Sequence, residues 1–598
     1  FNDGWGWSSA RDDPLFIRDQ WFRDSQAAMG HASSRGNVMH LYINGLYWGL
    51  YNPSERPDVS FAAETFGGEK EEYDAVNHNG LHGGNMAAYN QMIAISEEVE
   101  NGASQAIKNE AYQRIQGKLP DGSDDPTEEI WLDMTNYIDY ILLNHYGGND
   151  DWPNRNWFSN RRRGPESEGY RFFAWDSEIS LALSSRTDIH ESYIDVSSVA
   201  AEAYGNLRES DEFRIAFADR IHKHLFNGGA LYVNPASPTY DPANPQDNVP
   251  ASRFADLSDT VFEAIVAESA RWGDQHVTTP RTRNIDWQQE LDYMLGPYFR
   301  DRHDIVLDQW RAADLYPEIH APELLINSNW QHGGVIESGS LLSIDNSNPP
   351  PEIGVVYYTT DGSDPRLIGG AVNSASASMF SSDVSLESTT LIKARVNYNG
   401  GWSALTEALF IVPDADFDQN GLVTGADFLT WQQGFGISAA TAADGDADSD
   451  GDVDGNDLIH WQSQYGSSTA PTIASAVSAL SQPESGLVEY NSTETGTLPA
   501  PWPLSAGSAG VLQMVGSVGQ AMNLVRQGRM PLDEPEVLNQ RQAMVQLDET
   551  ETSNTGSANE TGIARPSTFA DKLTSDDVFA AWGEDTLQEL DFFPFLKD

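Results

Sequence analysis

The stretch GGNDDWPNRNWFSNRRRGPESEGYRFFAWDSEIS, residues 147–180, determines how the first half of the chain is interpreted. Apolar and aromatic residues at 156–160 and 170–175 predict two strands, and Gly164-Pro165 predicts a turn between them. A hairpin brings the start of its first strand next to the end of its second. We therefore expect Asn156 and Asp176 to meet at the base of the hairpin, with Asp151 in the loop that precedes it.

Three oxygen-bearing side chains at this spacing suit phosphoryl transfer. In kinases an Asp accepts the proton of the substrate hydroxyl, while an Asn five residues later and a distant Asp hold magnesium on the phosphates. The alternative is a polar loop that caps a hairpin. Because the chain has 90 acidic residues, an Asp followed five residues later by an Asn also arises by chance.

Three blocks of sequence, in order and spacing, resemble the spore coat protein H (CotH) kinase family: residues 40–58 (HLYINGLYWGLYNPSERPD), 149–157 and 173–176. The resemblance covers roughly residues 1–318 and implies an α+β domain like an atypical, secreted protein kinase. It implies that Asp151 is catalytic and that Asp176 binds the metal. Asn156 joins Asp176 as a ligand of Mg²⁺ or Mn²⁺ on ATP. Asp150 is the rival of Asp151, which is preferred because it sets the five-residue interval to Asn156.

Other parts of the nucleotide site are less defined by the sequence. The family's phosphate-positioning lysine lies in a segment before residue 1, so we expect this chain to be a processed or truncated product. Glu55 could face the nucleotide or order a lysine, and the alternative is a surface salt bridge. Tyr170 or Trp175 could stack on adenine, with Tyr170 preferred, and the alternative is core packing.

Helices are predicted around this hairpin. Asp125-Pro126 is typical of a helix start, and the apolar stripe from Trp131 to His145 would deliver the loop that carries Asp151. His145 on that stripe is interpreted as a core residue. Further helices are predicted over 16–29, 210–227, 254–272 and 287–310, and a two-residue hairpin turn at 44–45.

A second region, residues 319–413, is predicted to be a small β-sandwich. The segment YYTTDGSDP, residues 357–365, resembles the β-sandwich appended to chitobiase-type enzymes. Such a module is a spacer or a carbohydrate-associated accessory, and fold alone does not decide between the two.

Residues 414–467 contain two acidic loops that repeat after 30 residues. Both follow the EF-hand calcium pattern, with oxygen ligands at positions 1, 3, 5, 9 and 12 and a backbone carbonyl at position 7. The expected Ca²⁺ ligands are Asp416, Asp418, Asn420, Leu422, Thr424 and Asp427 in the first loop, and Asp446, Asp448, Asp450, Asp452, Asp454 and Asp457 in the second.

Each loop runs into a short helix, and the pair resembles dockerin type I repeats. The resemblance implies a cohesin-like or surface partner. The helices are expected to pack through Phe428, Leu429, Trp431, Leu458, Ile459 and Trp461. With five carboxylates against three, the second loop should bind Ca²⁺ more tightly. Residues 468–598 are poor in aromatics and are predicted to be mostly disordered.

Composition bounds the functions. Lys and Arg number 35 against 90 Asp and Glu, a net charge of −55, which repels nucleic acid and anionic membranes and attracts divalent cations. Adaptation to a salty medium explains the charge equally well. The absence of cysteine excludes disulfides and thiolate metal sites. No run of about 18 apolar residues exists, so no membrane span is predicted.

Two functions remain as alternatives for this multidomain chain. The first is a secreted or cell-surface atypical kinase that transfers the γ-phosphate of ATP to Ser or Thr of an extracellular protein. The second is a catalytically inactive scaffold or adhesion protein of the CotH fold, assembled at the cell surface through its calcium repeats. An intact lysine segment upstream would favour the first.

Overall fold

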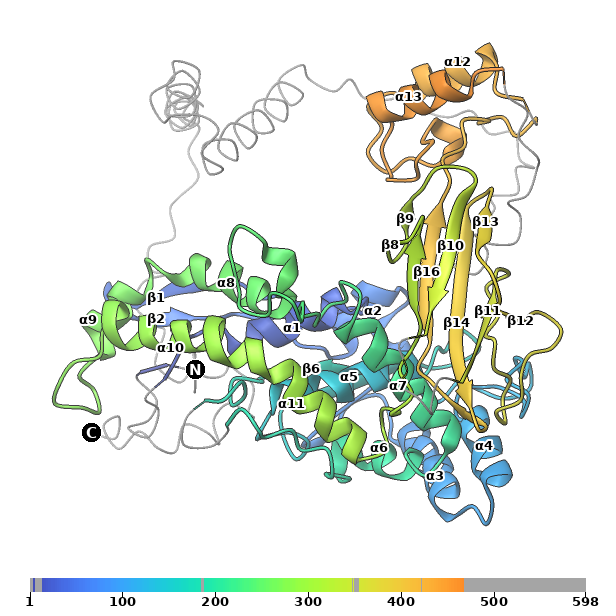
Figure 1. Ribbon diagram of the computed structural model, residues 1–598. Coiled ribbons are helices and arrows are strands. Elements are labelled where there is room, and N and C mark those ends of the chain that lie inside the picture. The colour runs from blue at the N-terminus through green and yellow to red at the C-terminus, as the bar shows by residue number, and fades with distance from the viewer. Residues whose placement is uncertain are drawn as a thin grey trace, which may run out of the picture. The chain divides into compact units, whose positions relative to one another are not determined.

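A computed structural model describes residues 4–5, 13–183, 188–346, 348, 354–420 and 422–466. The tail at 468–598, predicted to be disordered, lies outside the described residues. Within them the chain is mixed α/β, with helices and small sheets up to residue 312 and a β-rich region after it (Figure 1). This agrees with the predicted α+β region followed by a β-sandwich.

The hairpin predicted from residues 156–175 is confirmed as part of a four-stranded antiparallel sheet. The strand order is β4-β3-β5-β6, and Trp157 pairs with Ala174 at the open end of the hairpin. A separate two-stranded sheet, β1–β2, turns at Asn44-Gly45, where both residues have positive φ as such a tight turn requires. The strands are β1 (Met39–Ile43), β2 (Leu46–Tyr51), β3 (Tyr73–Asn77), β4 (Gly80–Gly83), β5 (Trp157–Arg162) and β6 (Arg171–Ala174).

Helices surround these strands. They are α1 (Arg18–Ala28), α2 (Val59–Phe66), α3 (Ala87–Asn101), α4 (Gln105–Arg114), α5 (Met134–Gly147), α6 (Glu202–Leu207), α7 (Asp211–Leu225), α8 (Val249–Val261), α9 (Ile265–Trp272), α10 (Gln288–Tyr293) and α11 (Phe299–Ala312). The predicted helices at 16–29 and 210–227 are confirmed as α1 and α7. The helix predicted over 287–310 is confirmed as a continuous helical run, in which two short π-helical segments, η4 (Arg283–Trp287) and η5 (Met294–Tyr298), flank α10 and lead into α11.

Two helix predictions were wrong in detail. Asp125 does not begin a helix: its carboxylate accepts a hydrogen bond from the N–H of Thr127 in a local turn. The helix that leads to Asp151 is α5, which begins after Asp133, whose carboxylate accepts from the Asn136 N–H at 3.0 Å. The segment 254–272 forms two helices, α8 and α9, with a break at residues 262–264.

Helix α5 runs through the middle of the hydrophobic core, and nearly all of its side chains are buried. His145 is fully buried, as predicted, and its Nδ1 accepts a hydrogen bond from Trp310 Nε1 at 3.2 Å. Burial lowers the pKa of His145 to about 3, with the charges of Arg208 and Arg302 acting in the same direction. His145 is therefore a neutral core residue.

The β-rich region contains two sheets that pack against each other. One has the order β13-β10-β7-β8, and the other β12-β11-β14-β16-β9 with β15 beside β14. The strands are β7 (Glu323–Ile326), β8 (Asn329–Trp330), β9 (Gly334–Val335), β10 (Ser340–Asp345), β11 (Val355–Thr359), β12 (Ser378–Met379), β13 (Val384–Leu386), β14 (Thr390–Tyr398), β15 (Gly401–Trp402) and β16 (Thr406–Ile411). Alternating residues such as Ile392, Ala394 and Val396 on β14 point into the shared core. Two further helices, α12 (Gly425–Gly434) and α13 (Gly455–Gln464), follow.

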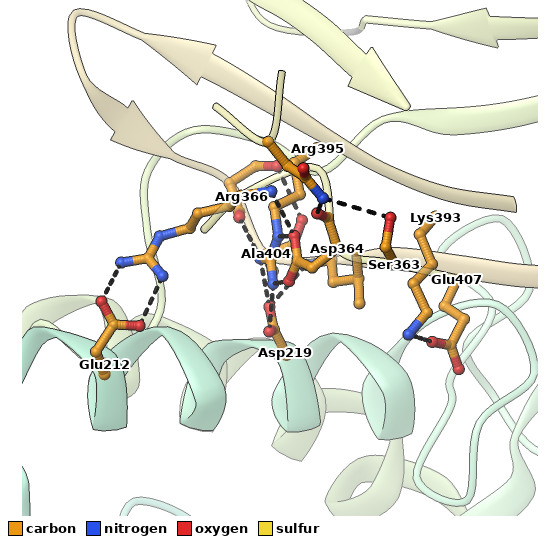
Figure 2. Close-up of polar contacts among 12 residues, drawn as sticks. Glu212, Asp219, Ser363, Asp364, Arg366, Lys393, Arg395, Ala404 and Glu407 are labelled. Carbon is orange, nitrogen blue, oxygen red and sulfur yellow. Dashed lines mark hydrogen bonds and ion pairs between the residues drawn. The ribbon is translucent and has the colours of Figure 1, made fainter. Parts of the chain in front are cut away.

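Two arginines of the sandwich bind carboxylates on α7 (Figure 2). Arg395 is almost fully buried and pairs with both Asp219 and Asp364, each at 2.6 Å. Arg366 donates to both carboxylate oxygens of Glu212 at 2.7 Å. Burial acts to lower the pKa of Arg395, but the two carboxylates outweigh it and raise the pKa. The sandwich is thus joined to α7 by desolvated ion pairs.

Loss of the Arg395 charge should strongly destabilise the protein. In Arg395→Met, the half-buried carboxylates of Asp219 and Asp364 lose their shared cation, which costs up to about 3 kcal/mol. The control is Lys393→Met on the same strand, because Lys393 pairs with Glu407 nearer the surface and such a pair contributes less than about 1 kcal/mol. Denaturant unfolding measures both variants. Equal losses would contradict the assignment.

The buried His145 predicts acid sensitivity. Its pKa is lower in the folded than in the unfolded protein, so its contribution to stability is complete above about pH 6.5 and is lost as pH falls toward 3. Between pH 7.5 and 5.0 the parent should lose about 2 kcal/mol through this residue. His145→Gln should lose correspondingly less over the same interval, measured by urea unfolding at both pH values. The exposed His320→Gln serves as the control, and a pH dependence identical in parent and His145→Gln would contradict the prediction.

Candidate functional site

The base of the β5–β6 hairpin brings together the three predicted side chains. Asn156 immediately precedes β5, and its Nδ2 donates to Asp151 Oδ2 at 3.3 Å and to the backbone carbonyl of Asp176 at 2.9 Å. Asn156 and Asp176 both adopt positive φ, 59° and 54°, so the chain turns sharply where it enters the hairpin and again where it leaves it. The amide of Asn156 therefore ties the Asp151 loop to the Asp176 turn.

The free edge of β6 is bonded by side chains instead of another strand. Gln26 of α1 donates to the carbonyl of Phe172 at 2.7 Å and accepts from the N–H of Ala174 at 3.0 Å. Asn136 of α5 accepts from the N–H of Phe172 at 2.6 Å. Since buried backbone groups must find partners, these amides fix the edge of the sheet just before Asp176.

Asp19 of α1 extends this edge past the end of the strand. Its Oδ1 accepts from the N–H of Ser177 at 2.9 Å, and its Oδ2 pairs with Arg23 at 2.8 Å. Arg23 lies on the same helix and is almost fully buried, so it holds the Asp19 carboxylate in a fixed position. The turn that carries Asp176 is thereby anchored to α1.

A cavity of about 240 Å³ lies at this turn. Its lining residues are Asp19, Tyr51, Asn52, Ser54, Trp175, Asp176 and Glu178. Glu178 is buried, and burial followed by the adjacent charge of Asp176 raises its pKa well above the usual value. Three carboxyl groups around a small cavity provide the oxygen atoms that a hard divalent cation prefers. Asp151 and Asn156 are not among the lining residues of the cavity. They are connected to it through the hydrogen bond from Asn156 to the Asp176 carbonyl.

Asp150 and Asp151 have different partners. The hydroxyl of Tyr193 donates to Asp150 Oδ1 at 2.8 Å, while Asp151 receives the amide of Asn156. The backbone N–H of Asp150 donates to the carbonyl of Ile179 at 2.9 Å. The geometry thus links Asp151, rather than Asp150, to Asn156.

Two of the predicted nucleotide-site residues lie elsewhere. Glu55 pairs with a segment 20 residues earlier, because its Oε2 accepts from the backbone N–H of Arg35 at 2.9 Å and its own N–H donates to the Arg35 carbonyl at 2.9 Å. Tyr170 is fully buried at the far end of the hairpin, with its ring edge-on to that of Tyr89. The prediction that Tyr170 stacks on adenine is therefore wrong, because Tyr170 packs in the core. Trp175 is the aromatic residue that lines the cavity.

Sequence reasoning missed Glu178 and Asp19. Glu178 lies two residues after Asp176, and in a chain with 90 acidic residues this spacing carries little information. Asp19 was hidden in the amphipathic pattern of α1, where a carboxylate looks like part of the solvated face. No signal in the sequence identifies it, because the burial of Arg18, Arg23 and Gln26 on the same helix is seen only in the structure.

The two acidic loops form a second candidate site, a pair of cation sites. Carboxylate oxygens gather within 4.8 Å of one another in three groups: Asp416, Asp418 and Asp427; Asp446, Asp448 and Asp450; and Asp452, Asp454 and Asp457. Asn420 accepts from the N–H of Leu422 within the first loop. The side chain of Asp452 joins a carboxylate group, whereas the sequence predicts a ligand only through its carbonyl.

The second loop shows a property that fits a bound cation. Among the described residues, the buried Oδ1 atoms of Asp446 and Asp448 have no hydrogen-bond donor. Burial, together with nearby carboxylates, raises the pKa of both groups. Buried carboxylate oxygens normally have partners, so a cation would supply the missing positive charge. The residues present therefore fit Ca²⁺.

The two loops are related by an internal repeat. Trp431 Nε1 donates to the carbonyl of Asp454 at 2.7 Å, and Trp461 Nε1 donates to the carbonyl of Thr424 at 2.8 Å. The last predicted ligand of each loop also caps the following helix: Asp427 accepts from Thr424 N–H, and Asp457 from Asp454 N–H. Each helix thus begins where its loop closes.

The packing predicted for the two helices is only partly observed. The ring of Phe428 contacts those of Trp431 and Trp461, at centroid distances of 5.5 and 4.9 Å. Leu429 and Ile459 are 53% and 60% exposed, so they do not form the helix contact that was expected. Ala415, Phe417, Val423 and Ala447 occupy the small core instead.

Comparison with known proteins gives one result for the first region. No curated protein matches the chain. Among the described residues, no helix has the length and apolar character needed to cross a membrane. Residues 3–228, which contain Asp19, Asp151, Asn156, Asp176 and Glu178, match the family model described as CotH kinase protein. This part of the chain is therefore similar to the CotH kinase protein family.

Proposed function

We propose that the chain is a secreted atypical protein kinase that transfers the γ-phosphate of ATP to a Ser or Thr hydroxyl of an extracellular protein. The observation that carries the proposal is the hydrogen bond of Asn156 to both Asp151 and Asp176, together with the acidic cavity beside it. The family match over residues 3–228 supports a kinase-like function for the same residues.

Each residue has a separate role in this proposal. Asp151 accepts the hydroxyl proton on a carboxylate oxygen as the substrate oxygen bonds to the γ-phosphorus, and ADP departs with the bridging oxygen. Asp176 and the Oδ1 atom of Asn156 would hold Mg²⁺ or Mn²⁺, which neutralises phosphate charge when bound. Glu178 and Asp19 offer further carboxylates at the same cavity. Trp175, on its wall, would contact the nucleotide.

Removal of Asp151 or Asp176 should separate catalysis from nucleotide binding. Asp176→Ala should abolish metal-dependent transfer of labelled phosphate and weaken nucleotide binding, because a metal ligand is lost. Asp151→Ala should reduce transfer by at least about 100-fold while nucleotide binding remains nearly intact, because it removes only the base.

The matched control is the exposed Asp259→Ala on α8, which should transfer phosphate like the parent. Equal residual transfer in the two site variants would contradict the assigned roles. A parent protein that binds nucleotide but transfers nothing would favour the catalytically inactive scaffold.

We also propose that residues 414–466 bind two Ca²⁺ ions and attach the protein to a cohesin-like or other surface partner. The buried, unpartnered oxygens of Asp446 and Asp448 support the ion site. In ion-free protein the clustered carboxylates repel one another, so ion binding and ordering of the loops should be coupled.

Calorimetry on the whole chain after chelation should give two Ca²⁺ ions, with the tighter ion lost in Asp446→Ala and the weaker one in Asp416→Ala. The second loop binds more tightly because it has more carboxylates. Asp345→Ala, an exposed substitution in the sandwich, should retain both ions. Stoichiometry of zero in the parent, or a circular dichroism spectrum unchanged on adding Ca²⁺, would overturn the proposal.

A further inference from the structure

Helix α11 lies outside the 3–228 match but reaches the loop that carries Asp151. Arg302 of α11 is fully buried beside the last turn of α5. Its Nε donates to the carbonyl of Tyr146 at 2.7 Å, and its Nη2 donates to the carbonyls of His145 at 2.6 Å and Glu191 at 2.7 Å. Its Nη1 donates to the carbonyl of Ile189. One guanidinium thus gathers four backbone carbonyls from two separate segments.

The chemistry of this contact follows from the end of α5. The final carbonyls of a helix lack partners within the helix and carry the negative end of its dipole. Within the described residues, every hydrogen bond of the Arg302 guanidinium goes to a backbone carbonyl. A planar guanidinium has five N–H groups in a fixed plane, whereas a lysine ammonium has three on a single nitrogen. Lysine could not span both segments.

Immediately after the end of α5 that Arg302 binds, the chain turns toward the candidate site. Gly148 adopts a left-handed conformation with φ of 57°, and a Cβ there would lie 2.5 Å from the carbonyl oxygen of Glu191. The N–H of Leu181 donates to the carbonyl of Gly147 at 2.7 Å. The loop from 147 to 151 is therefore held between the segment after Asp176 and the segment at 189–193.

We propose that Arg302 is a positioning residue for the catalytic loop: it fixes the end of α5 against residues 189–191 and so sets the position of Asp151. The expected effect of Arg302 on catalysis rests on the proposed kinase function, whereas its hydrogen bonds to the end of α5 and to residues 189–191 do not. It extends the part of the chain needed for catalysis to α11, beyond the matched residues. The Asp176 cavity is held from α1 instead, through Asp19 and Gln26.

The test is Arg302→Lys, with Arg300→Lys as the matched control on the same helix. Arg300 is partly exposed and pairs with the adjacent Asp301. Arg302→Lys should lower kcat for phosphate transfer by about 10- to 100-fold, because a small displacement of a catalytic group has effects of this size. The KM for ATP should stay within about 2-fold of the parent value. Unchanged kcat, or a KM for ATP that rises as steeply as kcat falls, would overturn the proposal.

A second measurement does not depend on activity. Hydrogen exchange at the amides of Asp150 and Leu181 should be at least about 10-fold faster in Arg302→Lys than in the parent and in Arg300→Lys, while exchange in β5 and β6 stays the same. If the parent transfers no phosphate, the kinase proposal fails, and exchange alone decides the role of Arg302. Unchanged exchange at these amides would contradict that role.

Gly148→Ala provides an independent variant in case Arg302→Lys does not fold. Its added Cβ pushes the same two segments apart while the guanidinium is kept. It should reproduce the fall in kcat and the faster exchange at Asp150 and Leu181. A folded Gly148→Ala protein with parental kcat and exchange would show that this junction does not position Asp151, and would overturn the proposal.

Discussion

Buried guanidinium groups hold this protein together where another protein of its size could use disulfides. Arg18 of α1 binds Glu290 of α10, Arg302 binds the end of α5, and Arg395 joins the sandwich to Asp219 of α7. The chain has no cysteine and only 35 Lys and Arg against 90 acidic residues. The chain thus has few basic side chains, and several of them are buried. Removal of a buried arginine would leave uncompensated carboxylates or carbonyls in the core.

The candidate kinase site depends on this arrangement from two sides. Helix α1 supplies Gln26 and Asp19 to the free edge of β6 and the turn after it, so Asp176 is fixed by side chains from a segment far away in sequence. The end of α5 is fixed by Arg302 of α11. Asn156 joins the two halves through its amide. A site of this kind is rigid only if α1, inside the family match, and α11, beyond it, are both present.

The sequence predicted the parts of this site that depend on local patterns. Apolar and aromatic residues at 156–160 and 170–175, with Gly164-Pro165 between them, identified the hairpin, and its geometry placed Asn156 near Asp176. Contacts between distant segments were not predictable: nothing in residues 170–175 distinguishes the buried Tyr170 from Trp175, which lines the cavity. The helix start predicted at Asp125 was wrong because Asp133, inside the apolar stripe, caps the helix instead. Glu178 was missed because its burial depends on α1 and the β2 region, which a local pattern cannot show.

If the two acidic loops bind Ca²⁺ as proposed, the crossed tryptophan bonds between them imply cooperative binding. Trp431 is bonded to the carbonyl of Asp454 in the other loop, and Trp461 to that of Thr424. An ion that orders one loop also orders the carbonyl to which the opposite helix is attached, so part of the conformational entropy of the second binding event is already lost when the first ion is bound. The two loops would then fill over a narrower range of ion concentration than two independent sites.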